Sequence, residues 1–327
     1  MRLAIIVPIS VHEELPVIQR SVENVMRLDR GELDVRAVYV VDSTSDKDER
    51  AEFLRSVKGI EVLQRTPPEG RKARAMNEAL DRIGETDYVV FLDVDSRPDR
   101  NFLTVCVNEL KANKEAFIAS GPRYVTNANE TRITAIVSAE YKVLADIYRL
   151  FNYFGGFAVF NGLVGVVDGS VFRDARFSEE VMCEDYELTQ RLYLRGRTAK
   201  FTKKTRVGEQ APITLQDLYH QRLRWVTGAV EGLGDLRDVM KSNISKNRKR
   251  SWVAIMILPF FIAMFSLLVS LYADKLWKSR SSNRDFLVKY FGLMFHVWLL
   301  EVCGIVALIK HLANRRVEWK KIERSNV

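Results

Sequence analysis

Residues 88–98 read YVVFLDVDSRP, and this stretch decides how the rest of the chain is interpreted. Its first five residues are apolar or aromatic, a run that suits a buried strand and is too short for a core helix. Asp93 and Asp95 follow directly, and in an extended chain residues two apart point to the same side. We therefore expect both carboxylates to face one hard cation at the carboxyl end of a strand, where open α/β sheets bind ligands.

The Asp93–Asp95 pair is a weak signal when taken alone. The chain contains a second Asp-x-Asp, formed by Asp46 and Asp48, and aspartates in a turn are mostly solvated. A magnesium or manganese ion held by few carboxylates keeps coordination positions for a diphosphate. The surrounding sequence must decide between a metal site and an ordinary turn.

Strand and helix patterns alternate over the first third of the chain, which predicts an α/β fold with a parallel sheet. Short apolar runs that end at turn residues indicate strands, and apolar residues at helical spacing indicate helices. Strands are predicted at residues 3–7, 35–41, 60–63, 88–92 and 117–120, and helices at 16–28, 51–57, 72–83, 101–110, 131–150 and 181–195. The stretch 153–169 is apolar but holds five glycines, so we expect a loop–strand–loop that lines a site.

Composition narrows the classes of partner. The 327 residues include 50 Lys and Arg against 42 Asp and Glu, a net charge of +8. No basic run alternates with aromatic residues as a nucleic-acid groove requires, so no nucleic-acid partner is expected. The three cysteines are widely spaced, which favours a reducing compartment over a disulfide framework. The N-terminal apolar run is too short for a signal peptide, and the catalytic part is expected in the cytoplasm.

The character of the sequence changes at Lys246. Residues 252–272 contain no charge and are long enough to cross a bilayer. Residues 286–309 form a second candidate span, although they contain Lys289, His296 and Glu301. Basic residues flank both outer ends and place the N-terminal domain on the cytoplasmic side. A buried core helix remains the alternative for each span. The predicted domains are a catalytic domain at 1–211, amphipathic interfacial helices at 212–245, and a transmembrane region with a basic tail at 246–327.

Three further clusters could carry chemistry. Residues 183–188 read CEDYEL, an acidic helix start that could merely complement the helix dipole. Residues 221–225 read QRLRW, in which Gln221 and Trp225 share a helix face; the alternative is an amphipathic helix with snorkelling arginines. Residues 70–77 read GRKARAMN, a basic helix start suited to phosphate or a solvated face.

Taken in order, the motifs resemble the membrane-bound, processive-type members of glycosyltransferase family 2, the group of cellulose, chitin and hyaluronan synthases. The likeness covers about residues 2–228. The matching segments are IIVPISVHEE (5–14), VVDSTSD (40–46), GRKARAMNEAL (70–80), FLDVDS (91–96), FNGLVGVVDGS (160–170), CEDYEL (183–188) and QRLRW (221–225). Ser43 stands where an acidic residue or glycine is common, and residues 161–165 are apolar where polymer synthases often carry small polar residues, so the nucleotide base and the acceptor contacts stay open.

The resemblance implies a GT-A (Rossmann-like) domain and a role for each matching residue. Asp185 would be the general base that deprotonates the acceptor hydroxyl, supported by Glu184. Asp95, with Asp93, would hold a divalent cation, Mg²⁺ or Mn²⁺, and Asp93 would also contact the nucleotide. The other donor-binding residues would be Pro8, His12, Glu13 and Asp42 at the base and ribose, Lys72 at the diphosphate, and Gln221, Arg224 and Trp225 at the diphosphate and acceptor.

The resemblance therefore implies an inverting, metal-dependent glycosyltransferase at the cell membrane. Polymer synthases flank this domain with helices on both sides, whereas this chain carries two or three predicted spans, all after it. We expect single transfer of a hexose, from GDP-mannose or a UDP-hexose, to a lipid-linked acceptor in glycolipid or N-glycan precursor synthesis. The alternatives are a homo-oligomeric polysaccharide synthase, a membrane protein that binds nucleotide sugars without catalysis, and a soluble glycosyltransferase with core helices at its end.

Overall fold

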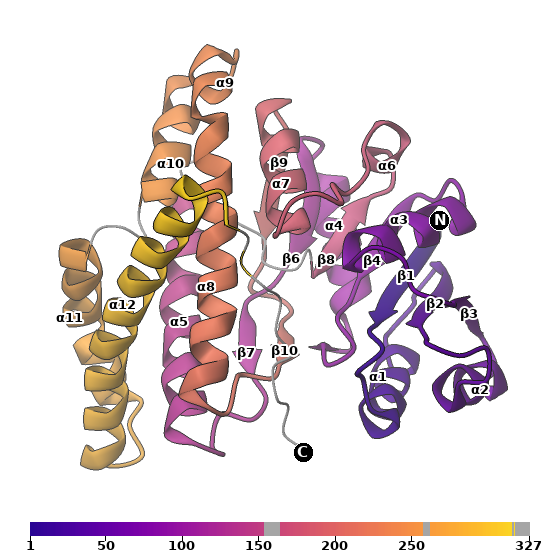
Figure 1. The fold of residues 1–327 in the computed structure, drawn as a ribbon, viewed down its shortest axis with the longest axis horizontal. Helices are drawn as coiled ribbons and strands as arrows, with labels where there is room; N and C mark the ends of the chain where they lie inside the picture. Colours follow the sequence, from indigo (N-terminus) through magenta and orange to yellow (C-terminus); the bar gives the residue numbers. More distant parts are fainter. Residues whose placement is uncertain (154–163, 258–261, 316, 318–327) are drawn as a thin grey trace. The chain divides into compact units, whose positions relative to one another are not determined.

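The computed structural model describes residues 1–153, 164–257, 262–315 and 317 (Figure 1). The chain divides into two compact units, which are described one at a time. The first unit comprises Met1–Pro122 and Ala158–Glu209, and the second comprises Arg123–Phe157 and Gln210–Val327.

A seven-stranded sheet with the order β3-β2-β1-β4-β8-β6-β9 forms the centre of the first unit. The strands β1, β2, β3 and β4 are parallel, as the alternating sequence pattern predicts. The strand β8 runs antiparallel between β4 and β6, and β6 pairs in parallel with β9. The bounds are β1 (Arg2–Ile9), β2 (Asp34–Asp42), β3 (Ile60–Arg65), β4 (Tyr88–Phe91), β6 (Ala116–Ser120), β8 (Gly165–Asp168) and β9 (Thr198–Phe201), with a short antiparallel pair of β5 (Arg97–Pro98) and β10 (Val207–Glu209).

Alternation along β1 divides the core of this unit between the two faces of the sheet. Leu3, Ile5 and Val7 pack with the buried faces of α1, α2 and α4, whereas Ala4 and Ile6 pack with those of α3 and α7. Successive side chains of a strand point to opposite faces, so a run that is apolar at every position buries both. The helices are α1 (Leu15–Met26), α2 (Glu49–Ser56), α3 (Lys72–Ile83), α4 (Phe102–Ala112), α6 (Val171–Asp174) and α7 (Glu184–Leu194).

The glycine after β8 is required by close packing. A Cβ on Gly169 would lie 2.0 Å from the carbonyl oxygen of Thr86, a distance that no side chain tolerates. Glycine therefore lets the end of β8 lie against the residues that precede β4. The predicted loop–strand–loop is confirmed only for its strand, because residues 154–163 lie outside the described residues.

The second unit consists mainly of helices, and α5, α8 and α12 pack side by side in it (Figure 1). Apolar residues of α5 and α12 form one cluster with α11, and those of α5 and α8 form another with Val125 and Ala211. The elements are β7 (Arg123–Val125), α5 (Arg132–Tyr153), α8 (Leu215–Gly232), a 3₁₀ turn at Leu233–Asp235, α9 (Leu236–Lys241), α10 (Lys246–Ile257), α11 (Ile262–Lys278) and α12 (Asn283–Leu312).

Among the described residues, one helix is long and apolar enough to cross a membrane, and it is α12, with a mean hydropathy of 2.1 over its most apolar window. It contains the second predicted span, 286–309. The first predicted span, 252–272, includes residues 258–261, which lie outside the described residues. More than one membrane span therefore stays a prediction, as does the division of the chain at residues 211 and 245.

Candidate active site

The carboxyl ends of β1, β2 and β4 meet at one edge of the sheet. The chain passes from β1 outward to β2 and β3 and then returns to place β4 on the other side of β1. The crevice at such a topological switch point is where open α/β sheets bind ligands. Pro8 lies near the end of β1. His12 lies in the turn that follows, Glu13 comes directly after that turn, and Asp42 is the last residue of β2.

The residues after β4 form a tight turn. The strand ends at Phe91, and Val94 and Asp95 occupy the turn. It is closed from both sides, because the Ser96 amide donates to the carbonyl of Asp93 at 2.9 Å and the Asp93 amide donates to the Ser96 hydroxyl at 3.1 Å. The sequence prediction assumed an extended chain from Asp93 to Asp95. That assumption was wrong, because these residues form a turn.

Lys72 connects this turn to helix α3. It is the first residue of α3, and its Nζ lies 2.5 Å from Oδ1 of Asp93. Gly70, two residues earlier, adopts φ +71°, a left-handed conformation that favours glycine and lets the chain enter the helix here. The motif at residues 70–77 thus places Lys72 in contact with the turn that contains Asp93 and Asp95.

The acidic pair of α7 lies in the electrostatic field of the same lysine. Burial alone would lower the pKa of Lys72. The carboxylates of Asp93, Glu184 and Asp185 together outweigh this effect, so the pKa of Lys72 is raised above its ordinary 10.5. The ammonium group of Lys72 is therefore charged at neutral pH, and carboxylates from two segments far apart in the sequence favour that charge.

Asn77 holds α3 against the segment that leads into α7. Its side-chain amide donates to the carbonyl of Phe177 and accepts from the Phe177 amide, both at 3.0 Å. Arg176 pairs with Asp81 of α3 at 3.0 Å. These contacts explain why Glu184 and Asp185, the first residues of α7, lie near the beginning of α3.

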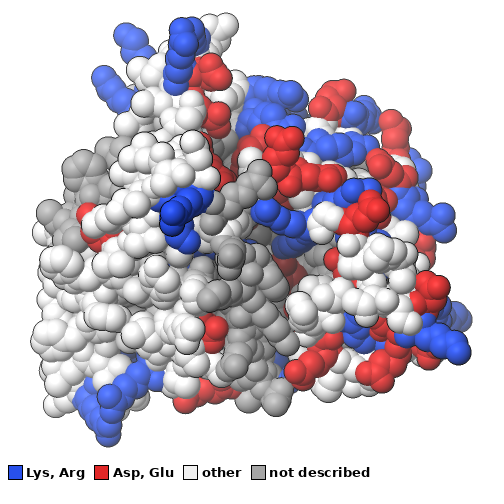
Figure 2. Space-filling view, viewed as in Figure 1, with Lys and Arg blue, Asp and Glu red and all other residues white. Residues whose placement is uncertain are grey.

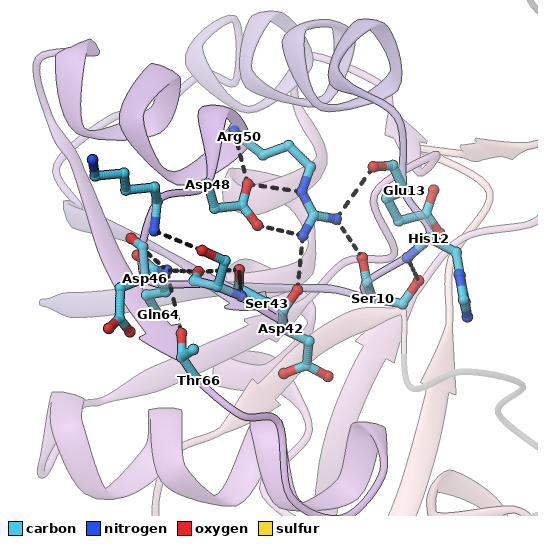
Figure 3. Close-up of polar contacts among 12 residues, drawn as sticks. Ser10, His12, Glu13, Asp42, Ser43, Asp46, Asp48, Arg50, Gln64 and Thr66 are labelled. Carbon is cyan, nitrogen blue, oxygen red and sulfur yellow. Dashed lines mark hydrogen bonds and ion pairs between the residues drawn. The ribbon is translucent and has the colours of Figure 1, made fainter.

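A buried arginine joins the ends of β1 and β2 (Figure 3). The Arg50 guanidinium contacts both carboxylate oxygens of Asp48, at 3.0 and 2.6 Å. It also donates to the carbonyl oxygens of Ser10 at 2.8 Å, Glu13 at 3.3 Å and Asp42 at 2.8 Å. Arg50 therefore fixes the backbone on both sides of the predicted base and ribose pocket.

Asp48 is part of this clamp and not a solvated turn residue. Its carboxylate accepts from the backbone amide of Arg50 at 2.9 Å and caps α2. Its side chain is 9% exposed, and the hydrogen bond from the Arg50 side chain is the main reason that its pKa is lowered. The sequence interpretation of the Asp46–Asp48 pair as solvated is wrong for Asp48.

Asp42 is paired with an arginine of the neighbouring strand. Arg65, at the end of β3, contacts Oδ1 of Asp42 at 2.7 Å and Glu78 at 3.0 Å. Burial raises the pKa of Asp42, and the charge of Arg65 opposes that rise. An arginine in this position can hold the carboxylate in one orientation, which suits a group that accepts hydrogen bonds from a ribose.

The Gln-x-x-Arg-Trp motif lies on α8 in the second unit. Arg222, between the motif's Gln221 and Arg224, is fully buried, so the snorkelling interpretation is wrong for this arginine. It donates to Oε1 of Gln221, and its guanidinium lies 4.1 Å from the ring centre of Trp225. Arg224 lies on the same helix and is partly buried.

The residues present fit a divalent cation. The carboxylate oxygens of Asp93 and Asp95 are hard ligands of the kind that Mg²⁺ and Mn²⁺ prefer. No group of three or more His, Cys, Asp or Glu side chains suited to a metal occurs in the described part of the chain. Asp93 and Asp95 would hold such an ion with two protein carboxylates, and a cation bound by few protein ligands would keep coordination positions for a substrate.

A family model described as "Glycosyl transferase family group 2" matches residues 88–309. The chain belongs to this family. The match begins at β4 and includes the Asp93–Asp95 turn, the acidic start of α7 and the motif on α8. The family assignment confirms the resemblance seen in the sequence. Pro8, His12, Glu13, Asp42 and Lys72 precede the matched region.

Curated relatives of this glycosyl transferase carry related activities in their names. It is 26% identical over 285 residues to the probable glucomannan 4-beta-mannosyltransferase 14 of Arabidopsis thaliana, covering 82% of this chain and 52% of the relative. It is 24% identical over 264 residues to the poly-beta-1,6-N-acetyl-D-glucosamine synthase of Staphylococcus aureus, covering 80% of this chain and 60% of the synthase. The chain thus spans less than two thirds of these relatives.

Solved structures share the fold of this glycosyl transferase. The mannosyltransferase PcManGT of Pyrobaculum calidifontis, solved with GDP-Man and Mn²⁺, superposes with a TM-score of 0.62 at 18% identity, covering 96% of this chain and 88% of that one. S. aureus TarS 1-349 gives a TM-score of 0.54 at 14% identity, covering 100% and 97%. The predicted GT-A fold is confirmed.

Sequence reasoning missed several residues that hold the site together. In the sequence, three arginines resemble ordinary surface arginines of helices and strands. Only their burial in the structure distinguishes them: Arg50, Arg65 and Arg222. One signal was available for Arg50, since Asp48 precedes a helix start and arginine two residues later can reach its carboxylate. The partners of Arg222 come from distant segments, and no local pattern pointed to them.

Proposed function

We propose that this protein is an inverting, metal-dependent glycosyltransferase that moves a hexose from a nucleotide diphosphate sugar to a lipid-linked acceptor. GDP-mannose or a UDP-hexose is the donor, with the mannose donor favoured, and the setting is glycolipid or N-glycan precursor synthesis. The named relatives that transfer mannose and the fold shared with a GDP-Man complex support this choice of donor.

One observation carries the proposal: Lys72 contacts Asp93 at the switch-point edge of the sheet, and the charges of Glu184 and Asp185 on α7 help to raise the pKa of the same lysine. This set contains a fixed cation for a diphosphate, an acidic turn for a metal, and a second acidic pair from a separate helix. A sugar transfer needs these three functions together, because charge must be neutralised on one side of the sugar and a proton removed on the other.

The residues act in a single displacement. The acceptor hydroxyl gives its proton to Asp185 while its oxygen forms a bond to the anomeric carbon of the sugar. The bond from that carbon to the diphosphate breaks, and the diphosphate leaves with the electron pair. Lys72 and Arg224 neutralise the departing charge, and the attack from the opposite side inverts the anomeric configuration. Asp93 and Asp95 would hold a divalent cation, which would supply Lewis-acid neutralisation of the diphosphate.

The remaining predicted residues bind and orient the donor. Pro8, His12, Glu13 and Asp42 surround the base and ribose. Arg50 fixes the backbone there through the carbonyl oxygens of Ser10, Glu13 and Asp42. Glu184 supports Asp185 at the start of α7. Gln221 and Trp225 contact the diphosphate and frame the acceptor.

An apolar stripe on α12 supports a membrane setting. Large apolar residues with exposed side chains recur every three or four positions on one face of this helix: Leu287, Phe291, Phe295, Trp298, Val302, Ile305 and Ile309. Contiguous exposed apolar surface of this kind marks an interaction site, and the surface over α11 and α12 is mostly white in Figure 2. Basic residues stand at both ends, among them Arg284 and Lys310, as suits anionic lipid head groups.

We therefore propose that membrane lipid covers this stripe and that the enzyme is a multi-pass cell-membrane protein with its catalytic unit in the cytoplasm. Detergent should be needed to extract the protein. Release into a detergent-free alkaline wash would contradict the membrane part of the proposal and leave the chemistry to be judged separately.

The test is nucleotide release. Solubilised protein is incubated with Mn²⁺, a membrane lipid extract and single UDP- or GDP-sugars, with an EDTA control. The expected result is release from one donor that EDTA removes. Binding of a donor without release, in the presence of the lipid extract, would contradict the proposal and favour a non-catalytic nucleotide-sugar-binding protein.

A second candidate is a polysaccharide synthase assembled from several copies of the chain. It is favoured by the polymer-forming relatives, glucomannan mannosyltransferase and poly-N-acetylglucosamine synthase. Product length separates the two candidates, because single transfer adds one hexose to each acceptor whereas a synthase yields a ladder of longer products.

A further inference from the structure

Among the described residues of the second unit, Arg222 is the largest fully buried charged side chain. It has no solvent-exposed surface, although a guanidinium is always charged and normally reaches water. Its side chain donates to Oε2 of Glu140 and to Oε1 of Gln221, and it stacks on the ring of Trp225 at 4.1 Å. Two of these three partners belong to the Gln-x-x-Arg-Trp motif.

Glu140 and His296 hold Arg222 from two other helices. Glu140 comes from α5 and is 9% exposed, and His296 comes from α12 and is 3% exposed. Nε2 of His296 lies 3.0 Å from Oε1 of Glu140 and 3.5 Å from Nε of Arg222. The network therefore links α5, α8 and α12 through one buried carboxylate.

We propose that Arg222, held by Glu140 and His296, is the positioning residue that fixes Gln221 and Trp225 for contact with the donor diphosphate. This inference rests on the proposed function, which assigns the diphosphate contact to the motif. Arg222 itself acts through its neighbours.

The chemistry of the amide gives the reason for Gln221. A guanidinium has donors only, so the Gln221 atom that faces it must be the carbonyl oxygen. The NH₂ group is then turned away from Arg222 and is able to donate to an anion. Without Arg222 the amide is free to rotate and can present its oxygen to a phosphate, which repels it.

The stacking contact gives the reason for Trp225. A cation over the face of an indole ring is attracted by the ring quadrupole, and a buried arginine that is anchored elsewhere restricts the ring to one orientation. Because His296 lies on the helix that carries the apolar stripe, the network also ties the motif to the surface that we assign to lipid.

The experiment compares nucleotides with one and two phosphates. Affinities for GDP, UDP, GMP and UMP are measured calorimetrically with Mn²⁺ on the full, detergent-solubilised chain, together with kcat and KM for nucleotide release. The variants are Arg222→Met and Arg222→Lys. Lysine keeps the charge beside Glu140 but cannot also hold the Gln221 oxygen in the planar arrangement of a guanidinium.

Leu293→Ala is the matched control. Leu293 is buried on α12 and packs in the cluster that includes Ala139 and Val143 of α5, so the substitution loosens the same helix packing without removing a polar group of the network. It should lower Tm and leave the diphosphate-to-monophosphate affinity ratio at the wild-type value.

We expect Arg222→Lys to remain folded and to lower the affinity for the diphosphate at least tenfold, with monophosphate affinity within twofold of wild type. Arg222→Met should show the same loss if folded, and Arg222→Lys decides if it is not. A wild-type ratio in folded Arg222→Lys, or an equal change in Leu293→Ala, would overturn the inference alone. A wild-type protein that binds neither GDP nor UDP would overturn the proposed function and the inference with it.

Discussion

Removing the Arg50 clamp should weaken both the fold of the first unit and its hold on nucleotides. The substitution Arg50→Met keeps the length and apolar volume of the side chain and removes the guanidinium. That group donates to the Asp48 carboxylate and to three backbone carbonyl oxygens from the ends of β1 and β2. The loss therefore affects one buried ion pair and the backbone conformation of the residues after two strands.

The magnitude follows from the contacts. Breaking a buried ion pair by removal of one partner costs about 3–5 kcal/mol. Asp48 keeps its hydrogen bond from the backbone amide at residue 50, and carbonyls near an exposed turn regain water, so the lower end applies and we expect about 3 kcal/mol. For a unit of this size that corresponds to a fall in Tm of roughly 6–12 °C. Affinity for GDP and UDP should fall about tenfold, about 1.4 kcal/mol, since the backbone of the pocket is no longer fixed.

Thermal unfolding and nucleotide titration of the solubilised protein measure both effects. Arg55→Met is the matched control, because Arg55 is an exposed arginine of the same helix whose side chain contacts Gln64. Its substitution should change stability by no more than about 0.5 kcal/mol. If Arg50→Met unfolds and binds nucleotides like Arg55→Met, the clamp has no role and the reasoning fails.

Three further predictions concern individual carboxylates. Asp185→Asn should bind the donor with an affinity within about threefold of wild type, and its rate of nucleotide release should fall by a factor of about 10²–10⁴. The control Glu187→Gln, on the same helix, should stay active. A fully active Asp185→Asn would exclude Asp185 as the base. Asp95→Ala should abolish the gain in donor affinity that Mn²⁺ gives in a titration with and without metal, and an unchanged gain places the cation elsewhere. The hydrogen bond from Arg50 lowers the pKa of Asp48 below its ordinary 3.8. The ionised carboxylate therefore contributes its full stabilisation above about pH 4, and this stabilisation is lost as the pH falls further and the carboxylate becomes protonated. The difference in Tm between wild type and Asp48→Asn should therefore be constant from about pH 7 to pH 5 and shrink below about pH 4; a difference independent of pH contradicts the pairing.

The parallel part of the sheet could be predicted because its strands are buried on both faces. The apolar runs at residues 3–7 and 88–92 became β1 and β4, and α3 begins and ends at the predicted residues, Lys72 and Ile83. The spacing of apolar residues and the length of each apolar run are local features of the sequence, and they are enough to locate these strands and helices. The antiparallel insertion of β8 between β4 and β6 could not be predicted, because strand order depends on contacts between distant segments.

The sequence predicted the chemical role of a polar residue of the site more often than it predicted which residue it contacts. Lys72 was expected at a diphosphate, and in the structure it contacts Asp93, which no spacing in the sequence indicates. Arg222 has the same local pattern as a surface arginine of an amphipathic helix, and its burial follows from the packing of α5 and α12 on α8. Charged residues are almost never fully buried without partners, so identifying such a residue requires knowing the partners first.

The stereochemistry of transfer tests the central claim most directly. Once the donor panel has identified the sugar, a donor labelled with ¹³C at the anomeric carbon is incubated with the enzyme, Mn²⁺ and membrane lipid, and the linkage in the product is determined by NMR. A single displacement with Asp185 as base predicts an anomeric configuration opposite to that of the donor. A product that retains the donor's configuration would contradict the assignment of Lys72, Asp93, Glu184 and Asp185 as one inverting site.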